Sequence, residues 1–178
     1  MADAAQGTVA RAGRQIGWRS VGSGPPAILL NGYAGTAADW DPNFLDALSA
    51  SFEVVLPDHR GMGTSTWGDD TEALTIESMA DDVVALADAL SLRTFPLIGW
   101  SMGGMVAQAV VTRAPARVSA LALLGTDAGG PGAVLADPDV WSRLTDTTGT
   151  DREQATRLLG VLFPPEVAAE LDAQVGAM

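Results

Sequence analysis

The residues best suited to chemistry form the segment Gly99-Trp100-Ser101-Met102-Gly103, a G-x-S-x-G pattern. The segment lies between an apolar run typical of a strand and a stretch typical of a helix. A serine on so sharp a turn is exposed to a substrate, and glycines two residues before and after it leave room for the tight backbone. Free N–H groups at the start of the helix favour negative charge. The pattern predicts a nucleophilic Ser101; the alternative is a glycine-rich turn with an incidental serine.

The chain contains one histidine that could activate such a serine, His59, which lies in the glycine-rich segment 58–65. A serine hydroxyl needs a neighbouring base to take its proton. The same segment also suits a structural turn, in which Asp58 and Arg60 form charge-assisted hydrogen bonds. We favour the structural interpretation, and a general base at His59 is the alternative.

The composition excludes several kinds of site. The absence of cysteine rules out disulfides and thiolate nucleophiles, and a single histidine argues against a zinc site with several ligands. All ten basic residues are arginine, which excludes a P-loop, because that loop needs a lysine. The aspartate pairs Asp39/Asp41 and Asp137/Asp139 lack the other ligands of a calcium loop and are interpreted as solvated turns. We therefore expect no metal and no cofactor.

Length and charge suggest where the protein acts. The 178 residues predict one domain, and the net charge of −12 disfavours binding to nucleic acids or anionic membranes. No apolar run approaches the ~20 residues of a membrane span, and the first 15 residues lack the apolar core of a signal peptide. These features predict a soluble, cytoplasmic protein.

Short apolar runs alternate with longer segments in which apolar residues recur every three or four positions. The short runs predict strands over Thr8–Ala12, Gln15–Val21, Pro26–Leu30, Phe52–Leu56, Phe95–Ile98 and Val118–Leu124. The longer segments predict helices over Asn43–Ala50, Thr75–Leu90, Ser101–Ala114, Asp137–Asp146, Asp151–Leu162 and Pro165–Val175. This alternation predicts an α/β fold with a doubly wound, mostly parallel sheet. Since no strand is expected after Leu124, we predict a sheet-bearing part, 1–127, and a helical part, 128–178.

The whole pattern resembles the α/β-hydrolase family, over essentially the full chain but with only the first part of that family's fold represented. Besides the serine motif, three segments carry the resemblance in the family's order: Leu30-Asn31-Gly32-Tyr33, Asp58-His59-Arg60-Gly61-Met62-Gly63-Thr64-Ser65 and Gly125-Thr126-Asp127. The family usually has His-Gly where this chain has Asn31-Gly32. That difference leaves the backbone donor of the loop intact.

The resemblance implies a role for individual residues of this sequence. Ser101 would be the nucleophile, and Gly99 and Gly103 would allow its sharp turn. The backbone N–H groups of Tyr33 and Met102 would form the oxyanion hole, which binds the negatively charged oxygen of the reaction intermediate.

The rest of the catalytic triad is only partly represented. Some family members carry the triad acid where Asp127 stands, whereas most carry it after the following strand; the alternative is that Asp127 caps its loop. The family's histidine comes from a loop beyond two further strands, and His59 follows the wrong strand for that role. We therefore expect the amino-terminal portion of a longer hydrolase, or else a complete protein without catalysis. The fragment is favoured, because the strand Val118–Leu124 would otherwise leave an unpaired edge.

The expected function is hydrolysis of an ester-like carbonyl substrate through an acyl-enzyme, incomplete in this chain alone. The helical part resembles a lid whose apolar side chains line a pocket or, as we favour, pack its own core: Trp141, Leu144, Leu158, Leu162 and Phe163. The expected partners are a small hydrophobic carbonyl substrate and either a carboxy-terminal fragment of the same hydrolase or a second copy. The alternative is a non-catalytic module that binds a small hydrophobic ligand or a protein.

Overall fold

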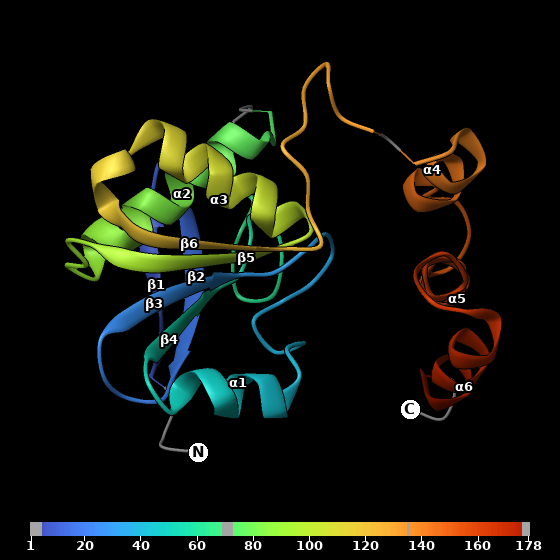
Figure 1. The fold of residues 1–178 in the computed structure, drawn as a ribbon, viewed down its shortest axis with the longest axis horizontal. Helices are drawn as coiled ribbons and strands as arrows, with labels where there is room; N and C mark the ends of the chain where they lie inside the picture. The colour runs from blue at the N-terminus through green and yellow to red at the C-terminus, as the bar shows by residue number, and fades with distance from the viewer. Residues whose placement is uncertain (1–4, 69–72, 135, 176–178) are drawn as a thin grey trace. The chain divides into compact units, whose positions relative to one another are not determined.

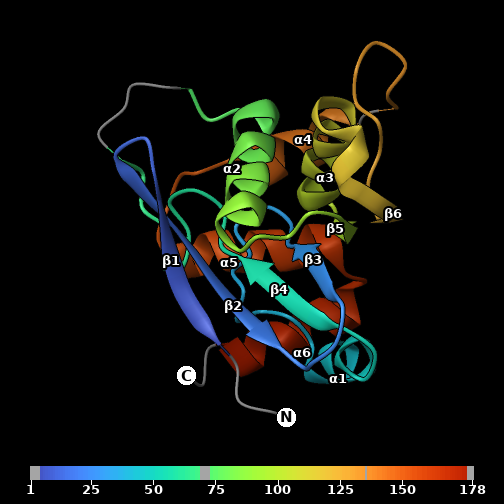
Figure 2. The ribbon, with the colours of Figure 1, turned by 90° about the vertical axis from the view of Figure 1, so that its left-hand side faces the viewer.

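The computed structural model describes residues 5–68, 73–134 and 136–175 and divides the chain into two compact units, Met1–Gly130 and Pro131–Met178. In its described residues the first unit contains a six-stranded sheet in the order β1-β2-β4-β3-β5-β6 (Figure 1). Helices cover both faces of this sheet, as Figure 2 shows from the side. The predicted α/β class with a doubly wound, mostly parallel sheet is confirmed.

The strands are β1 (Gln6–Arg11), β2 (Arg14–Val21), β3 (Pro26–Leu30), β4 (Glu53–Pro57), β5 (Phe95–Trp100) and β6 (Val118–Leu124). The first two form a hairpin, and β2 is also antiparallel to β4, whereas β4, β3, β5 and β6 run parallel. The hairpin turn consists of Ala12 and Gly13, both at positive φ, one residue earlier than positions 13 and 14, which the predicted strands Thr8–Ala12 and Gln15–Val21 leave between them. The shift arises because Arg11 pairs with Arg14, which leaves a two-residue turn.

Among the described residues, three α-helices pack on the sheet: α1 (Pro42–Ser49), α2 (Ile76–Ala89) and α3 (Met102–Arg113). A short 3-10 helix, η1 (Pro115–Arg117), follows α3. Thr75 is the N-cap of α2, because its hydroxyl accepts a hydrogen bond from the Ser78 N–H. Successive residues of β3 point to opposite faces, so Ile28 packs in the core under α2 and α3, whereas Leu29 packs in the core over α1.

In its described residues the second unit contains α4 (Pro138–Thr145), α5 (Asp151–Leu162) and α6 (Pro165–Val175), with α4 packed on α5 and α5 on α6. Leu144 and Leu158 are half-buried here. The other three apolar side chains expected to pack this unit, Trp141, Leu162 and Phe163, are exposed, which corrects that prediction. The reason is that helices packed in a simple series each cover only part of their neighbour's apolar face.

The strand at one edge of the sheet is largely uncovered. Among the described residues β6 pairs with β5 alone, and its Leu121, Leu123 and Leu124 are exposed. Long apolar edges are normally paired or covered in folded proteins.

None of the helices that the structure describes is long and apolar enough to cross a membrane.

Candidate active site

Ser101 occupies a strained turn between β5 and α3. Its backbone has φ 52° and ψ −123°, a conformation that residues other than glycine rarely adopt. The Ser101 N–H donates to the Leu124 carbonyl oxygen at 2.9 Å, which fixes the turn to the end of β6. In the part of the chain that the structure describes, the Ser101 hydroxyl has no hydrogen-bond partner. The serine therefore lies at the end of the sheet with its hydroxyl available.

The glycines around Ser101 are required by close backbone contacts. A Cβ atom on Gly99 would lie 2.4 Å from the Gly103 carbonyl oxygen. A Cβ atom on Gly103 would lie 2.4 Å from the carbonyl oxygens of both Leu30 and Asn31. Real Cβ atoms do not approach other atoms so closely. These two glycines thus let the end of β3, the serine turn and the start of α3 meet.

The loop of residues 31–36, which we call the oxyanion loop because the sequence predicts an oxyanion donor in it, lies beside Ser101. A Cβ atom on Gly32 would be 3.2 Å from the Ser101 Cβ. The backbone N–H groups of Tyr33 and of Met102 have no acceptor among the described residues. If Ser101 acts as a nucleophile, two free donors of this kind can bind the developing oxyanion.

Asn31 shapes this loop, a role that sequence reasoning missed. Its Oδ1 accepts the Gly32 N–H at 2.8 Å, and its Nδ2 donates to the Thr36 carbonyl oxygen at 2.8 Å. The side chain therefore bridges both ends of the loop that carries Tyr33. The signal in the sequence was a buried-type strand that ends in a polar residue followed by glycine.

His59 is bound to this loop. The ring is buried, and its Nε2 lies 2.9 Å from the Asn31 carbonyl oxygen, to which it donates. Burial lowers the pKa of His59 below 6.5, since desolvation disfavours the charged ring. No hydrogen bond joins His59 to Ser101 among the described residues. This geometry favours the structural interpretation of His59.

Asp58 joins the glycine-rich segment to Ala37, the residue that follows the oxyanion loop; the sequence predicts hydrogen bonds of Asp58 within the glycine-rich turn, but not this bond to Ala37. Its Oδ1 accepts the Ala37 N–H at 2.7 Å. Its Oδ2 accepts the Thr64 N–H at 2.8 Å and the Thr64 hydroxyl at 2.9 Å. One buried carboxylate thus holds two loops at the same edge of the sheet.

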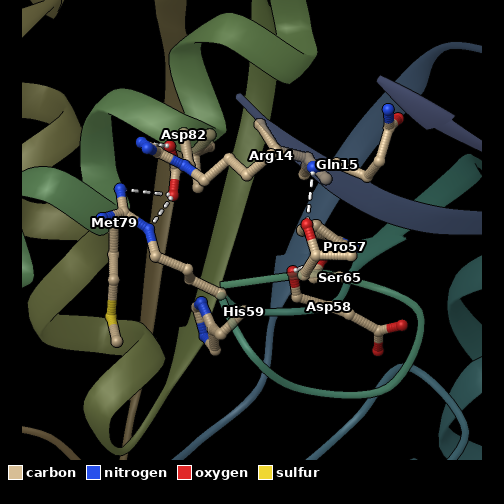
Figure 3. A pocket seen from close by; sticks show the side chains of 12 residues that line it. Arg14, Gln15, Pro57, Asp58, His59, Ser65, Met79 and Asp82 are labelled. Carbon is tan, nitrogen blue, oxygen red and sulfur yellow. Dashed lines mark hydrogen bonds and ion pairs between the residues drawn. The ribbon is translucent and has the colours of Figure 1, made fainter. Parts of the chain in front are cut away.

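Arg60 anchors the glycine-rich segment to α2 through Asp82. The Arg60 guanidinium donates to Asp82 at 2.9 Å, and Arg14 donates to the same carboxylate at 2.8 Å. Figure 3 shows Arg14 reaching Asp82, while the Asp58 carboxylate points away from both. Sequence reasoning missed Asp82, although it sits on the apolar stripe of its helix, three residues after Met79.

Asp127 lies on the exposed loop after β6. Its carboxylate accepts the Gly129 N–H at 2.5 Å, and its backbone carbonyl accepts the Gln108 amide at 2.7 Å. The structure shows no contact between Asp127 and Ser101 among the described residues. The contacts that it does show are those of the loop-capping alternative.

The two aspartates near α1 are bound within their own turns. Asp39 accepts the Thr36 N–H at 2.7 Å, and Asp41 accepts the Phe44 N–H at 2.9 Å as the N-cap of α1. Over residues 5–68, 73–134 and 136–175, no three side chains of metal-binding type cluster together.

Comparison with known proteins adds to this geometry. Residues 25–168 match the family model described as alpha/beta hydrolase fold. The chain is 34% identical over 110 residues to a protein of Agrobacterium fabrum named as a carbamate hydrolase, RutD, across 62% of this chain and 41% of that protein. It is 29% identical over 150 residues to pyrrolizixenacetamide deacetylase of Xenorhabdus hominickii, across 82% of this chain and 53% of that protein.

Solved structures agree with this assignment. A hydrolase from Pseudomonas aeruginosa superposes with a TM-score of 0.75 at 30% identity, covering 94% of this chain and 65% of that one. The chain spans about half the length of the curated relatives that it matches. The serine turn, the sheet around it and these matches together show that the chain belongs to the family of proteins with the α/β-hydrolase fold.

Proposed function

We propose that this chain carries the nucleophile and the oxyanion hole of a serine hydrolase acting on an ester-like carbonyl substrate. The observation that carries the proposal is the strained backbone of Ser101 beside the free N–H groups of Tyr33 and Met102. Backbone strain persists where surrounding structure enforces it, and it concentrates at active sites. The relatives named as a carbamate hydrolase and a deacetylase support a carbonyl substrate.

In the proposed reaction the Ser101 oxygen attacks the substrate carbonyl carbon while a base takes the hydroxyl proton. The carbonyl oxygen becomes an oxyanion and accepts hydrogen bonds from the N–H groups of Tyr33 and Met102. The leaving group departs with the proton from the base, and an acyl-enzyme forms on Ser101. Water, deprotonated by the same base, then releases the acid. Each oxyanion donor contributes a factor of about 10²–10³ to the rate in comparable sites.

The base is proposed to come from a further polypeptide segment that pairs with the open edge of β6. His59, the single histidine of this sequence, is buried and bonded to the Asn31 carbonyl oxygen. The match covers only 41% and 53% of these two relatives, which supports a carboxy-terminal portion of the same hydrolase as the source. Asp127 is the proposed acid partner of the incoming histidine, because its exposed carboxylate lies on the loop that leaves β6.

A serine-directed fluorophosphonate tests the nucleophile. Wild type, Ser101→Ala and the matched control Ser51→Ala, which alters an exposed serine, are incubated with the probe and their intact masses measured. We expect one adduct in wild type and in Ser51→Ala, and none in Ser101→Ala. Labelling is slow for this chain alone and faster when a carboxy-terminal portion is added, because only then is a base present. An adduct that survives in Ser101→Ala contradicts the proposal.

A second candidate function is a non-catalytic module that binds a small hydrophobic ligand or a protein. The position of His59 favours this second function, because the ring is hydrogen-bonded to the Asn31 carbonyl oxygen of the oxyanion loop. The same experiment separates the hydrolase from the binding module. A chain that binds a carbonyl ligand, yet acquires no adduct either alone or with the carboxy-terminal portion, is a binding module.

A further inference from the structure

A cavity of about 500 Å³ in the first unit lies beside the hairpin of β1 and β2, which Figure 2 shows at one edge of the sheet. Its wall combines side chains of both strands with side chains from the loops after β3 and β4: Gln6, Thr8, Arg19, Ala37, Asp58 and Thr64. Neither Ser101 nor Tyr33 is among the residues that line it. The volume falls within the range of about 300–1,000 Å³ typical of small-molecule sites.

Arg19 gives this cavity a positive charge that has no ion-pair partner in the part of the chain that the structure describes. Over residues 5–68, 73–134 and 136–175, seven of the ten arginines pair with aspartates, and the other three are Arg19, Arg93 and Arg143. Arg93 and Arg143 are exposed, whereas Arg19 is half-buried. Because a charge withdrawn from water is unfavourable without a partner of opposite sign, this position favours a bound anion.

The Arg19 guanidinium has one edge bonded to the protein and another edge available. Its Nε and Nη2 donate to the Ala37 carbonyl oxygen at 2.8 and 2.5 Å. A guanidinium carries five N–H groups in a planar fork, so two on Nη1 and one on Nη2 remain for a ligand. Parallel N–H groups on these two nitrogens can bind both oxygens of a carboxylate. The bonds to Ala37 hold the fork in place, which lowers the entropic cost of binding.

Two neutral side chains beside Arg19 can add hydrogen bonds to the same anion. Gln6 lies directly opposite Arg19 in the β1–β2 ladder, and Thr8 lies two residues further along β1, on the same face. Neither side chain has a hydrogen-bond partner among the described residues. The Gln6 amide and the Thr8 hydroxyl can both donate.

Asp58 limits the charge that the cavity accepts. Its carboxylate lines the cavity, and its oxygens accept hydrogen bonds from the Ala37 N–H, the Thr64 N–H and the Thr64 hydroxyl. These bonds fix a negative charge in the wall, and that charge repels a second negative charge on a ligand. One arginine and one aspartate in the wall therefore suit a monoanion better than a dianion such as phosphate.

We propose that this cavity binds a small organic acid as its monoanion, with the carboxylate on the available edge of Arg19 and hydrogen bonds from Gln6 and Thr8. The cavity is larger than a carboxylate group alone, and Trp18 and Ala38 add apolar surface to its wall. The rest of the acid lies against that surface. The inference is independent of the proposed function, because it involves no residue of the serine turn.

Titration with para-fluorobenzoate, followed by fluorine NMR, tests the ligand class. We expect saturable binding to wild type and at least tenfold weaker binding of para-fluorobenzamide, a neutral ligand of similar shape, because it loses the charge-assisted hydrogen bonds to Arg19. Inorganic phosphate should displace the benzoate only at higher concentration. No saturable binding, equal affinity for the benzamide, or tighter binding of phosphate would overturn the proposal.

Three variants test the position of the site. Arg19→Gln should weaken benzoate binding at least tenfold, whereas the matched control Arg93→Gln removes the same charge at an exposed arginine and should change it less than twofold. Gln6→Glu places a carboxylate directly opposite Arg19, where it competes with the ligand and forms a favourable cross-strand pair. That variant should lose binding without losing stability, so the test remains decisive if Arg19→Gln folds poorly.

Further outcomes would contradict the site. Binding that persists in both Arg19→Gln and Gln6→Glu, or that weakens equally in Arg93→Gln, would overturn the proposal. Ser101→Ala should bind the benzoate as wild type does, and a loss of binding in that variant would place the ligand at the serine instead. Phosphonate labelling of Ser101 is measured separately, so the hydrolase and the anion site can fail independently.

Discussion

Replacing Gly103 by alanine tests whether the meeting of β3 and α3 creates the proposed oxyanion hole. In an ordinary helix interior, glycine to alanine stabilises by about 0.5–1 kcal/mol, because alanine loses less backbone entropy on folding. At position 103 the new Cβ would lie 2.4 Å from the carbonyl oxygens of Leu30 and Asn31. That distance is about 0.6 Å shorter than 3.0 Å, and real Cβ atoms essentially never approach other atoms more closely than 3.0 Å.

The clash should outweigh the gain in helix propensity. Both oxygens belong to the backbone at the buried end of β3, which is paired with β5, so neither can swing aside. Overpacking of this kind costs about 1–3 kcal/mol or more. We expect Gly103→Ala to lower the free energy of unfolding of the first unit by about 2 kcal/mol. A shift of Asn31 also moves the Tyr33 N–H, so Ser101 labelling by a phosphonate should slow by about 10- to 100-fold.

The assay is urea unfolding followed by amide hydrogen exchange and mass spectrometry of peptides, which reports the two units separately. Gly160→Ala, inside α5, is the matched control, because its Cβ would meet only the end of a flexible Arg143 side chain at 3.2 Å. That variant should leave the first unit unchanged and stabilise its own unit by up to about 1 kcal/mol. A Gly103→Ala protein as stable as wild type, with unchanged labelling, would refute the packing argument.

Three further outcomes are expected. Burial lowers the pKa of folded His59 below its unfolded value near 6.5. The unfolded chain therefore takes up the proton first as pH falls, and urea titrations should show stability lost below about pH 6.5. His59→Gln should remove that loss and change stability more than the chemical step of the complete enzyme; a loss of turnover of about 10³-fold or more in a folded variant would contradict the structural role. Asp82→Asn, which leaves two buried arginines without this carboxylate, should cost about 3 kcal/mol in urea titrations. By contrast Asp81→Asn, in a half-exposed ion pair, should cost less than about 1 kcal/mol, and equal costs would refute the burial argument. Light scattering and native mass spectrometry should detect a polypeptide paired with β6, whereas a strictly monomeric 18.3 kDa species with Ser101-dependent ester hydrolysis would contradict the missing partner.

Local pattern was enough to predict the elements of this fold. Short apolar runs of four to seven residues located the strands, and three- and four-residue spacing located α2, because both patterns depend on neighbours in the sequence. The Thr75 cap could be predicted for the same reason, since its acceptor and donor lie three residues apart. The predicted hairpin turn lay one residue too late in the chain. Gly13 can occupy either position of a two-residue turn, and only the pairing of the two strands decides which position it takes.

The site was predictable only in part. The spacing of Gly99, Ser101 and Gly103 indicated a sharp turn, but not what the glycines approach. Asp82 lies on the apolar stripe of its helix, but its partners could not be predicted, because Arg60 and Arg14 lie 22 and 68 residues away in the sequence. The sequence also could not distinguish a base from a structural ring at His59, since that depends on which carbonyl oxygen lies within reach.

By itself the sequence determined which segments become strands and helices, where the serine turn falls and which residue types are absent. Only the tertiary structure decided what those segments bring together: the carbonyl oxygens of Leu30 and Asn31 against Gly103, and the His59 ring against the Asn31 carbonyl oxygen. The physical reason is the sheet order β4-β3-β5, in which strands far apart in the chain become neighbours. Contacts across such crossovers are set by packing of the whole sheet, and no local pattern encodes them.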